Sequence, residues 1–331
     1  MSNRHYPDTG LMMLRFVALL VFFVCPLLQA APVVAQRPID VDTGTGVLHG
    51  SLLWPMSDKP VPVVLIISGS GPTDRDGNNP QGGRNDSLRK LAVLLAQHNI
   101  ASVRYDKRGV ATGQPLAPDE RTLSVEGYVA DAQAWARELK ADPRFGPLIL
   151  LGHSEGALIA ALAAPGAPGA KADAVVSLAG SGRPLDQVIR EQLKGRLPPD
   201  LELRSQQLLT RFKAGQYDAN VPAPLQVVFR PSVQPYLVSL LRQNPAAAFG
   251  HLKVPALIIQ GRNDIQVNLA DAQALKAAKP DAQLVLVDGM NHVLRIVPND
   301  LKAQVASYND RNLPLADALG NALVKFIDSV H

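Results

Sequence analysis

The chain has 331 residues, of which 47% are hydrophobic and 19% are charged, so it is long and apolar enough to bury a large core. Its formal net charge is +4, and the basic residues are scattered without a run of five or more like charges. Nucleic-acid binding relies on clustered basic residues and is therefore unsupported. A single cysteine, Cys25, excludes an intramolecular disulfide and a metal site built from several thiolates.

The first segment in chain order, residues 1–35, has the pattern of a secretory signal peptide. Arg4 and Arg15 precede an uncharged apolar run at residues 16–28, and small residues follow the run. The run is shorter than the roughly 20 residues that cross a bilayer as a helix. We expect cleavage near residues 30–35, a secreted or periplasmic protein and no stable membrane insertion after leader removal; an uncleaved leader would leave the protein membrane-anchored.

The segments that follow predict the start of a sheet. Residues 37–60 are predicted to form an antiparallel hairpin at the sheet edge. Residues 61–104 contain a β-branched apolar run, a stretch with apolar residues three and four apart, and a second apolar run. This order predicts a strand, a crossover helix and a buried strand, which together are the repeating unit of a parallel sheet. A further helix is predicted at residues 123–141, with Ser124 as its N-cap, and a short strand at residues 148–152.

The alternation of strands and helices continues toward the C-terminus. Further strands are predicted at residues 172–180, 256–261 and 282–289, and further helices at residues 269–279 and 313–329. This alternation predicts an α/β fold with a mostly parallel, doubly wound sheet that helices cover on both faces.

One long segment, residues 182–250, interrupts the alternation between two core strands. It contains helical patterns and no convincing strand, so we expect an inserted helical cap that forms a lid over a pocket. The core of the fold is then built from residues 37–181 and 251–331.

The pentapeptide Gly152-His153-Ser154-Glu155-Gly156 matches the spacing G-x-S-x-G. It lies between a predicted strand and an alanine-rich helix, which is the setting of a nucleophile elbow. A serine hydroxyl needs a base to take its proton during attack, and a histidine base needs an acid to hold its tautomer.

Position along the sheet selects the partners of Ser154. His292 is the histidine that follows a core strand and so lies at the same carboxyl edge as Ser154, whereas the elbow points the neighbouring His153 elsewhere. Asp264 stands three residues past the end of another strand, at the same edge. Asp288 and Asp271 reach His292 less naturally. The order Ser154, Asp264, His292 is the order of the α/β-hydrolase fold.

Two backbone N–H groups are candidates for an oxyanion hole. One belongs to Glu155, directly after the predicted nucleophile, and the other to Ser70 in the glycine-rich loop "SGSGP" after the first core strand. This loop matches neither the P-loop nor the dinucleotide pattern, so a phosphate site is not supported there. The acidic and basic residues around the loop are interpreted as groups that hold its conformation through hydrogen bonds. They are Asp74 to Asp76, Asp106 and Arg108.

Five motifs in order resemble one branch of the α/β-hydrolase fold: "SGSGPTDRDGNN", "YDKRG", "GHSEG", "LIIQGRNDIQV" and "MNHVL". The branch comprises bacterial serine carboxylesterases and relatives of serine aminopeptidases, and the likeness covers about residue 45 to the C-terminus. It implies a Ser154, Asp264 and His292 triad, an oxyanion hole at Ser70 and Glu155, and cleavage of esters with short or medium acyl chains without a cofactor. The cap departs from the branch, since Pro231-Ser232-Val233 stands where aromatic residues are common.

The sequence therefore predicts a serine hydrolase that cleaves small-molecule carboxylic esters through an acyl-enzyme intermediate. A serine exopeptidase or amidase that acts on short peptides is an alternative, because the same triad serves both reactions. A catalytically silent binding protein for an apolar ligand is a second alternative. We expect no metal, because no cluster of histidine and acidic residues has metal-ligand spacing, and the oligomeric state is left open.

Overall fold

An eight-stranded mixed sheet organises the chain in a computed structural model that describes residues 1–2 and 33–330. The strands follow the spatial order β1-β2-β4-β3-β5-β6-β7-β8. Their bounds are β1 (Val34–Asp42), β2 (Val47–Pro55), β3 (Val61–Ile67), β4 (Ala101–Tyr105), β5 (Phe145–His153), β6 (Ala174–Leu178), β7 (Ala256–Gly261) and β8 (Gln283–Val287). Most of the predicted leader lies outside the described residues.

The hairpin predicted at the sheet edge is present as β1 and β2. These strands pair antiparallel along their whole length, and β2 pairs antiparallel with β4. From β3 to β8 every neighbouring pair is parallel, so the carboxyl ends of these strands meet at one edge of the sheet. The sheet is therefore mostly parallel, as the sequence predicts.

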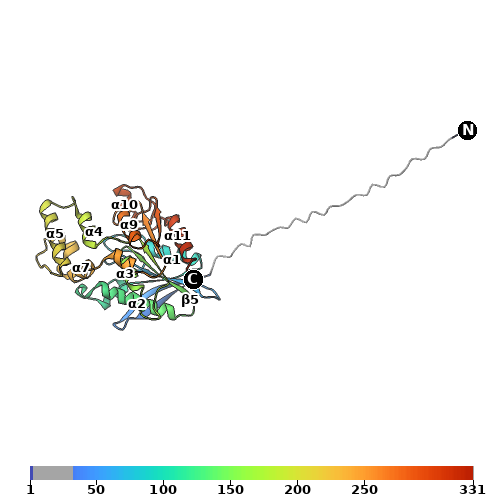
Figure 1. Ribbon diagram of the computed structural model, residues 1–331, viewed down its shortest axis with the longest axis horizontal. Coiled ribbons are helices and arrows are strands. Elements are labelled where there is room, and N and C mark those ends of the chain that lie inside the picture. Colours follow the sequence, from blue (N-terminus) through green and yellow to red (C-terminus); the bar gives the residue numbers. More distant parts are fainter. Residues whose placement is uncertain (3–32, 331) are drawn as a thin grey trace. The chain divides into compact units, whose positions relative to one another are not determined.

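Helices cover both faces of this sheet (Figure 1). Helices α1 and α11 pack on one face, and α2, α3 and α9 pack on the other. The bounds of the core helices are α1 (Ser87–Gln97), α2 (Val125–Ala141), α3 (Glu155–Ala163), α9 (Leu269–Ala278), α10 (Leu301–Ser307) and α11 (Asp317–Ile327). Ser124 caps α2 as predicted, because its side chain accepts a hydrogen bond from Gly127 N.

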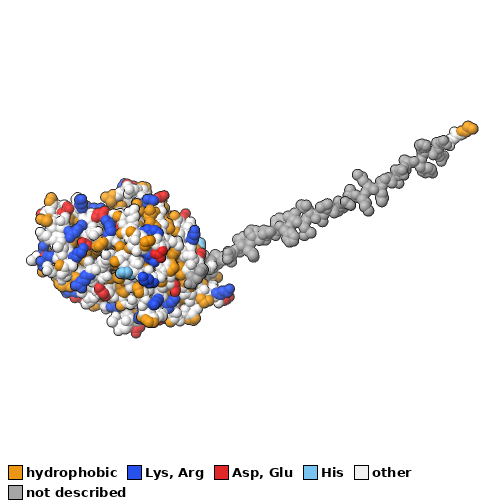
Figure 2. All heavy atoms as spheres, viewed as in Figure 1, with side chains coloured by type: hydrophobic (Ala, Val, Ile, Leu, Met, Phe, Trp, Pro, Cys, Tyr) orange, Lys and Arg blue, Asp and Glu red, His pale blue; other side chains and the backbone are white. Residues whose placement is uncertain are grey.

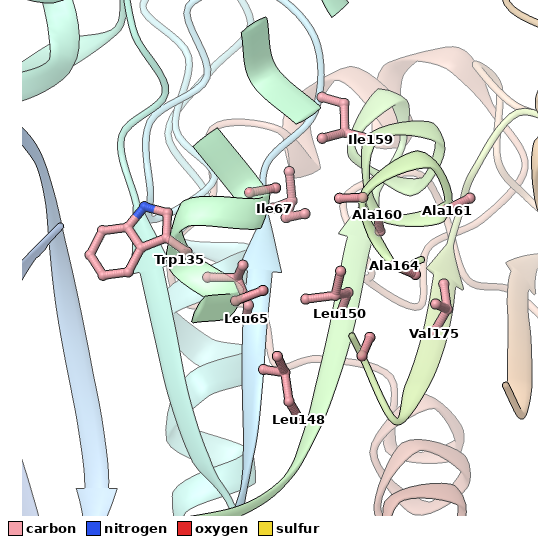
Figure 3. Close-up of a cluster of buried hydrophobic side chains, with 14 of the residues drawn as sticks. Leu65, Ile67, Trp135, Leu148, Leu150, Ile159, Ala160, Ala161, Ala164 and Val175 are labelled. Carbon is pink, nitrogen blue, oxygen red and sulfur yellow. The ribbon is translucent and has the colours of Figure 1, made fainter. Parts of the chain in front are cut away.

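The strand β3 divides its side chains between the two faces. Leu65 and Ile67 belong to the hydrophobic cluster under α2 and α3, whereas Ile66, between them, belongs to the cluster under α1 and α11. Figure 3 shows Leu65 with Trp135 of α2 on one side and Leu150 of β5 on the other. Burial on both faces explains why the parallel strands read as continuous apolar runs in the sequence.

The segment between β6 and β7 contains helices and no strand. Its helices are α4 (Leu185–Leu193), α5 (Pro199–Lys213), α6 (Gln226–Phe229), α7 (Gln234–Leu241) and α8 (Pro245–Gly250). Helices α4 to α7 share a hydrophobic cluster of their own, which includes Phe212 and Phe229. The last helix, α8, packs on α3 and α9, and its Phe249 belongs to the cluster of the sheet. The predicted fold class, an α/β-hydrolase core with an inserted helical cap, is confirmed.

The face in view in Figure 2 carries Lys and Arg side chains scattered among Asp and Glu side chains. Charges of both signs are thus interspersed on this face. Within the described residues, no helix has both the length and the apolar character needed to cross a bilayer.

Candidate active site

Ser154 sits at the sharp turn between β5 and α3. Its backbone has φ 55° and ψ −122°, a conformation that costs a residue with a side chain about 1–3 kcal/mol. Two hydrogen bonds hold the turn: Ser154 N donates to Leu178 O at 3.0 Å, and Ala157 N donates to Ser154 O at 3.0 Å. The sequence signature of a nucleophile elbow thus coincides with a strained backbone that the surrounding structure holds in place.

The two glycines of the G-x-S-x-G motif allow the chain to pass very close to itself. A Cβ atom on Gly152 would overlap the backbone oxygen of Gly156. A Cβ atom on Gly156 would overlap the backbone oxygen of Ile67, at the end of β3. Neither glycine has a positive φ, so close approach rather than backbone conformation requires a glycine at these positions.

The predicted base and acid are brought together by the loops that follow β8 and β7. The Nδ1 atom of His292 lies 2.8 Å from Oδ2 of Asp264, and both residues are buried. The other carboxylate oxygen of Asp264 accepts hydrogen bonds from the backbone N–H groups of Gln266 and Val267 at 2.8 and 2.9 Å. Burial alone would raise the pKa of Asp264, but the imidazole of His292 and these N–H donors more than offset it, so the pKa lies below its usual value.

Ser154 and His292 line the same cavity, which has a volume of about 170 Å³. Ser154 also lines a second and larger cavity of about 830 Å³, together with the two predicted oxyanion residues, Ser70 and Glu155. The structure therefore brings all five predicted site residues to one place at the carboxyl edge of the sheet.

The loop that carries Ser70 approaches Ser154 closely. A Cβ atom on Gly69 would stand 3.2 Å from the Cβ atom of Ser154, so glycine at this position lets the loop come near the elbow. The buried side chain of Lys107 donates a hydrogen bond to the backbone oxygen of Gly69 and lies 3.9 Å from Oε1 of Glu155. Lys107 belongs to the motif "YDKRG", but the sequence assigned no role to this lysine.

His153 was not expected to face His292, but its side chain does so. The Nε2 atom of His153 lies 2.9 Å from the backbone oxygen of His292, and the two ring centroids are 4.8 Å apart. Burial and the neighbouring His292 lower the pKa of His153 to about 4. At neutral pH the ring is uncharged, and its Nε2 must carry the proton because a carbonyl oxygen only accepts.

The acidic and basic residues after β3 and β4 brace these loops, as predicted. Arg75 donates to the carboxylate of Asp106 both from its backbone N–H, at 2.8 Å, and from its guanidinium, at 2.7 Å. The side chain of Arg108 donates to the buried carboxylate of Asp131 on α2. Asp74 accepts hydrogen bonds from two backbone N–H groups of its own loop.

The larger cavity lies between the sheet edge and the cap, and most of its wall is apolar. Leu123 and Leu158 line it from the core, whereas Val188, Ile189 and Leu237 line it from cap helices. A cavity of this size and character suits an organic ligand. Among residues 33–330, no group of three or more histidine, cysteine or acidic residues is placed to hold a metal ion.

Comparison with known proteins gives a family match and many structural relatives. Residues 85–296 match the family model described as serine aminopeptidase, S33. An esterase from Thermotoga maritima, EstD, is 30% identical over 254 residues; the alignment covers 75% of this chain and 58% of that protein. The chain thus spans less than two thirds of the length of this relative.

Solved structures agree on the fold at low sequence identity. Est1E from Butyrivibrio proteoclasticus, solved with ferulic acid, has a TM-score of 0.57 at 15% identity and covers 88% of this chain and 100% of its own. The α/β-hydrolase GrgF from a Penicillium species has a TM-score of 0.58 at 15% identity and covers 89% of this chain and 99% of its own. At these identities the likeness establishes the shared fold alone.

Proposed function

The chain belongs to the serine aminopeptidase S33 family of the α/β-hydrolase superfamily, and on this premise we propose that it is a serine hydrolase that cleaves carboxylic esters. One observation carries the proposal: Ser154 stands at a strained elbow and lines one cavity with His292, whose Nδ1 is held by the buried Asp264. This is the set of parts that nucleophilic acyl transfer requires.

In the first half of the reaction, Ser154 Oγ attacks the ester carbonyl carbon while its proton passes to Nε2 of His292. The negative charge that forms on the carbonyl oxygen is stabilised by the backbone N–H groups of Glu155 and Ser70. The carbon–oxygen bond to the alcohol then breaks, and the alcohol leaves with the proton from His292. In the second half, water attacks the acyl carbonyl carbon while its proton passes to Nε2 of His292. The bond from that carbon to Ser154 Oγ then breaks, the acid leaves, and His292 returns the proton to Oγ.

Asp264 does not take the proton in this scheme. Its carboxylate accepts the Nδ1–H of His292, which leaves Nε2 free to act as the base. The lowered pKa of Asp264 keeps the carboxylate ionised, so it stabilises the imidazolium that forms during attack.

The relative named an esterase supports ester cleavage, and the apolar wall of the larger cavity supports an acyl chain there. We propose short to medium acyl chains. In the cap stretch 231–233, Val233 lines this cavity, whereas Ser232 turns its hydroxyl to the carboxylate of Glu120. A serine exopeptidase or amidase remains the second candidate, because the description of the matching family model is that of an aminopeptidase.

We also propose that the protein is exported to the periplasm or the medium. The pattern of residues 1–35 supports export. Strand β1 begins at Val34, which pairs with Pro55, so cleavage after Ala30 leaves β1 whole, whereas cleavage after Ala35 removes its first two residues. Cleavage after Ala30 is therefore favoured, and the N-terminal sequence of protein recovered from the periplasm or medium tests it.

The proposed activity is tested with p-nitrophenyl butyrate and aminoacyl p-nitroanilides on the wild type and Ser154→Ala. We expect the wild type to hydrolyse the ester faster than the anilides, and Ser154→Ala to hydrolyse neither. A fluorophosphonate probe should label the wild type and leave Ser154→Ala unlabelled. Faster cleavage of the anilides would favour the peptidase, and a wild type that neither labels nor turns over substrate would favour a binding protein.

A further inference from the structure

Two cavities meet at Ser154, and they differ in size and in lining. The larger, of about 830 Å³, runs under the cap, and the smaller, of about 170 Å³, lies between the loop after β3 and the loop after β8. Ser154, Ser70 and Gln266 line both cavities. His292 lines the smaller cavity and is absent from the lining of the larger one.

The position of His292 decides which half of an ester enters which cavity. When the tetrahedral intermediate collapses, the leaving oxygen takes a proton from Nε2 of His292, so it must lie beside that ring. The alcohol half therefore points into the smaller cavity. The acyl half points into the larger, apolar cavity.

We propose that the smaller cavity is an alcohol subsite that selects a small, uncharged alcohol carrying a second hydroxyl group. The proposal rests on the ester hydrolysis argued above and adds the chemistry of the leaving group. Its volume of about 170 Å³ is roughly a fifth of the 830 Å³ of the larger cavity, so it suits the smaller, alcohol half of an ester.

The walls of the smaller cavity are about half polar and carry no charged side chain. Its lining contains glycines, hydroxyl and amide side chains, the apolar Leu88 and Val293, and no Lys, Arg, Asp or Glu among the described residues. His153, which also lines it, is neutral at neutral pH because burial lowers its pKa to about 4. A charged alcohol would enter this space without a counter-ion, which is unfavourable.

Tyr308 supplies a hydrogen-bond donor in this cavity. Its hydroxyl accepts a hydrogen bond from Nε2 of Gln266 at 2.7 Å and keeps its own proton for another acceptor. Burial raises the pKa of Tyr308, so this proton stays in place at physiological pH. Gln266 also lines the cavity, and its side-chain amide has an oxygen that can accept a hydrogen bond.

The segment that carries Tyr308 is hydrogen-bonded to the loop between β3 and α1, on the opposite side of the cavity. Arg84 N donates to Oδ1 of Asn309 at 3.1 Å, and Nδ2 of Asn85 donates to the backbone oxygen of Tyr308 at 3.3 Å. A Cβ atom on Gly83 would overlap that same oxygen, so glycine allows the loop to pass against Tyr308. The subsite is therefore formed before a substrate arrives, which favours discrimination between leaving groups.

A matched pair of esters tests the subsite: 2-hydroxyethyl octanoate and propyl octanoate, which differ by a hydroxyl in place of a methyl. We expect wild-type kcat/KM to favour the hydroxyethyl ester roughly five- to tenfold, the effect of one net hydrogen bond. Tyr308→Phe should bring the ratio close to one. Tyr217→Phe, at an exposed cap tyrosine, is the control and should keep the wild-type ratio.

A second measurement needs only the wild type. The acyl-enzyme formed from p-nitrophenyl octanoate partitions between water and an added alcohol, whose oxygen attacks the acyl carbonyl and displaces Ser154. Ethane-1,2-diol should capture more acyl group than propan-1-ol at equal concentration. If the enzyme hydrolyses esters but prefers neither the hydroxyethyl ester nor ethane-1,2-diol, the alcohol subsite is overturned and the proposed hydrolase function is kept. If a wild-type protein shows neither hydrolysis nor probe labelling, both proposals are overturned.

A second inference comes from Lys107, whose side chain contacts Gly69, the residue before one predicted oxyanion donor, and faces the side chain of Glu155, the other predicted donor. The side chain is 1% exposed, and burial lowers the pKa of its ammonium. Its Nζ donates to the backbone oxygen of Gly69 and faces Oε1 of Glu155 at 3.9 Å.

The geometry of a trans peptide links this contact to the oxyanion hole. The C=O of Gly69 and the N–H of Ser70 belong to one planar unit and point in opposite directions. Holding the carbonyl of Gly69 toward Lys107 therefore turns the N–H of Ser70 away from it. The same ammonium faces the side chain of Glu155, whose backbone N–H is the other predicted donor. We infer that Lys107 is a positioning residue that fixes both donors.

Lys107→Met tests this role against Lys279→Met, a matched control. Lys279, at the end of α9, is also buried. Its Nζ donates a hydrogen bond to the backbone oxygen of Leu252 at 3.2 Å. We expect Lys107→Met to lower kcat roughly 100-fold with little change in KM, the effect of losing one oxyanion donor. Lys279→Met should lower thermal stability and leave kcat within about twofold.

Ligand binding separates positioning from general loss of structure. A trifluoromethyl ketone forms a tetrahedral oxyanion on Ser154, whereas the carboxylic acid product does not. Lys107→Met should weaken ketone binding by the same factor as kcat and leave product binding almost unchanged. An equal loss of affinity for both ligands, or an unchanged kcat, overturns the inference. If Lys107→Met does not fold, Glu155→Gln, which removes the charge facing Lys107, replaces it. This variant should show a smaller fall in kcat and in ketone binding, with product binding unchanged.

Discussion

The Nε2 atom of His153 lies 2.9 Å from the backbone oxygen of His292, so the residue before the predicted nucleophile is bonded to the predicted base. Asp264 holds the ring of His292 through Nδ1. His153 holds the backbone of the same residue. The base is thus anchored at two points, and the elbow and the loop after β8 are tied together through it.

Replacing His153 tests this anchor. His153→Leu removes the donor and should lower kcat roughly 10- to 100-fold, because His292 then loses a fixed position relative to Ser154. His153→Gln places an amide N–H near the position of Nε2 and should keep most of the activity. Steady-state kinetics with p-nitrophenyl butyrate measure both variants, and equal activity in the wild type and His153→Leu would contradict the anchoring role.

The lowered pKa of His153 also predicts a loss of stability in acid. In the unfolded chain an ordinary histidine has a pKa near 6.5, whereas His153 in the fold has a pKa of about 4. Between these two pH values the histidine is protonated in the unfolded chain but not in the fold. The free energy of unfolding is therefore highest above about pH 6.5 and falls as the pH is lowered toward 4. At pH 5 this one group should cost about 2 kcal/mol relative to pH 7.

Urea unfolding at pH 7 and pH 5 measures this effect. His153→Gln has no titrating ring at this position, so its free energy of unfolding should fall less than that of the wild type between the two pH values. Equal losses in the two proteins would assign the acid sensitivity to other groups.

Much of the fold follows from the sequence because burial on both faces marks the parallel strands. The strand predicted at residues 256–261 is β7 with the same bounds. The helix α10 was not predicted, since it has only seven residues and both of its buried side chains, Gln304 and Ser307, are polar. Periodicity carries little information over so short a segment.

Topology also predicts part of the site. Ser154, Asp264 and His292 were selected because each follows a strand at the carboxyl edge, and the structure brings them together there; their catalytic roles stay predictions. Lys107 and Tyr308 were missed for a different physical reason. Their contacts join segments far apart in the sequence, as in the bond from Lys107 to Gly69, and no spacing rule connects such residues.

Asp264→Asn tests the acid of the predicted triad. An amide in place of the carboxylate favours the wrong tautomer of His292, and kcat should fall about 10³- to 10⁴-fold with little change in KM. The amide oxygen can still accept from the backbone N–H groups of Gln266 and Val267, so the variant should fold. Asp288→Asn is the matched control, because that carboxylate is exposed and pairs with Arg262 at 2.7 Å. Loss of activity in Asp288→Asn but not in Asp264→Asn would exchange the roles of the two aspartates.

Gly156→Ala tests whether the elbow depends on close approach of two backbones. The added Cβ would overlap the backbone oxygen of Ile67, and neither backbone can move without shifting β3 against α3. We expect the free energy of unfolding to fall by about 3 kcal/mol or more, together with a loss of activity because Ser154 is displaced. Gly146→Ala in β5, the strand that leads into the elbow, is the control: its Cβ would stand 3.8 Å from the nearest backbone atom, an ordinary contact, and its stability should change by less than about 1 kcal/mol. Thermal unfolding and fluorophosphonate labelling of the two variants make the comparison, and a Gly156→Ala protein that melts and labels like Gly146→Ala would show that the elbow tolerates a side chain there.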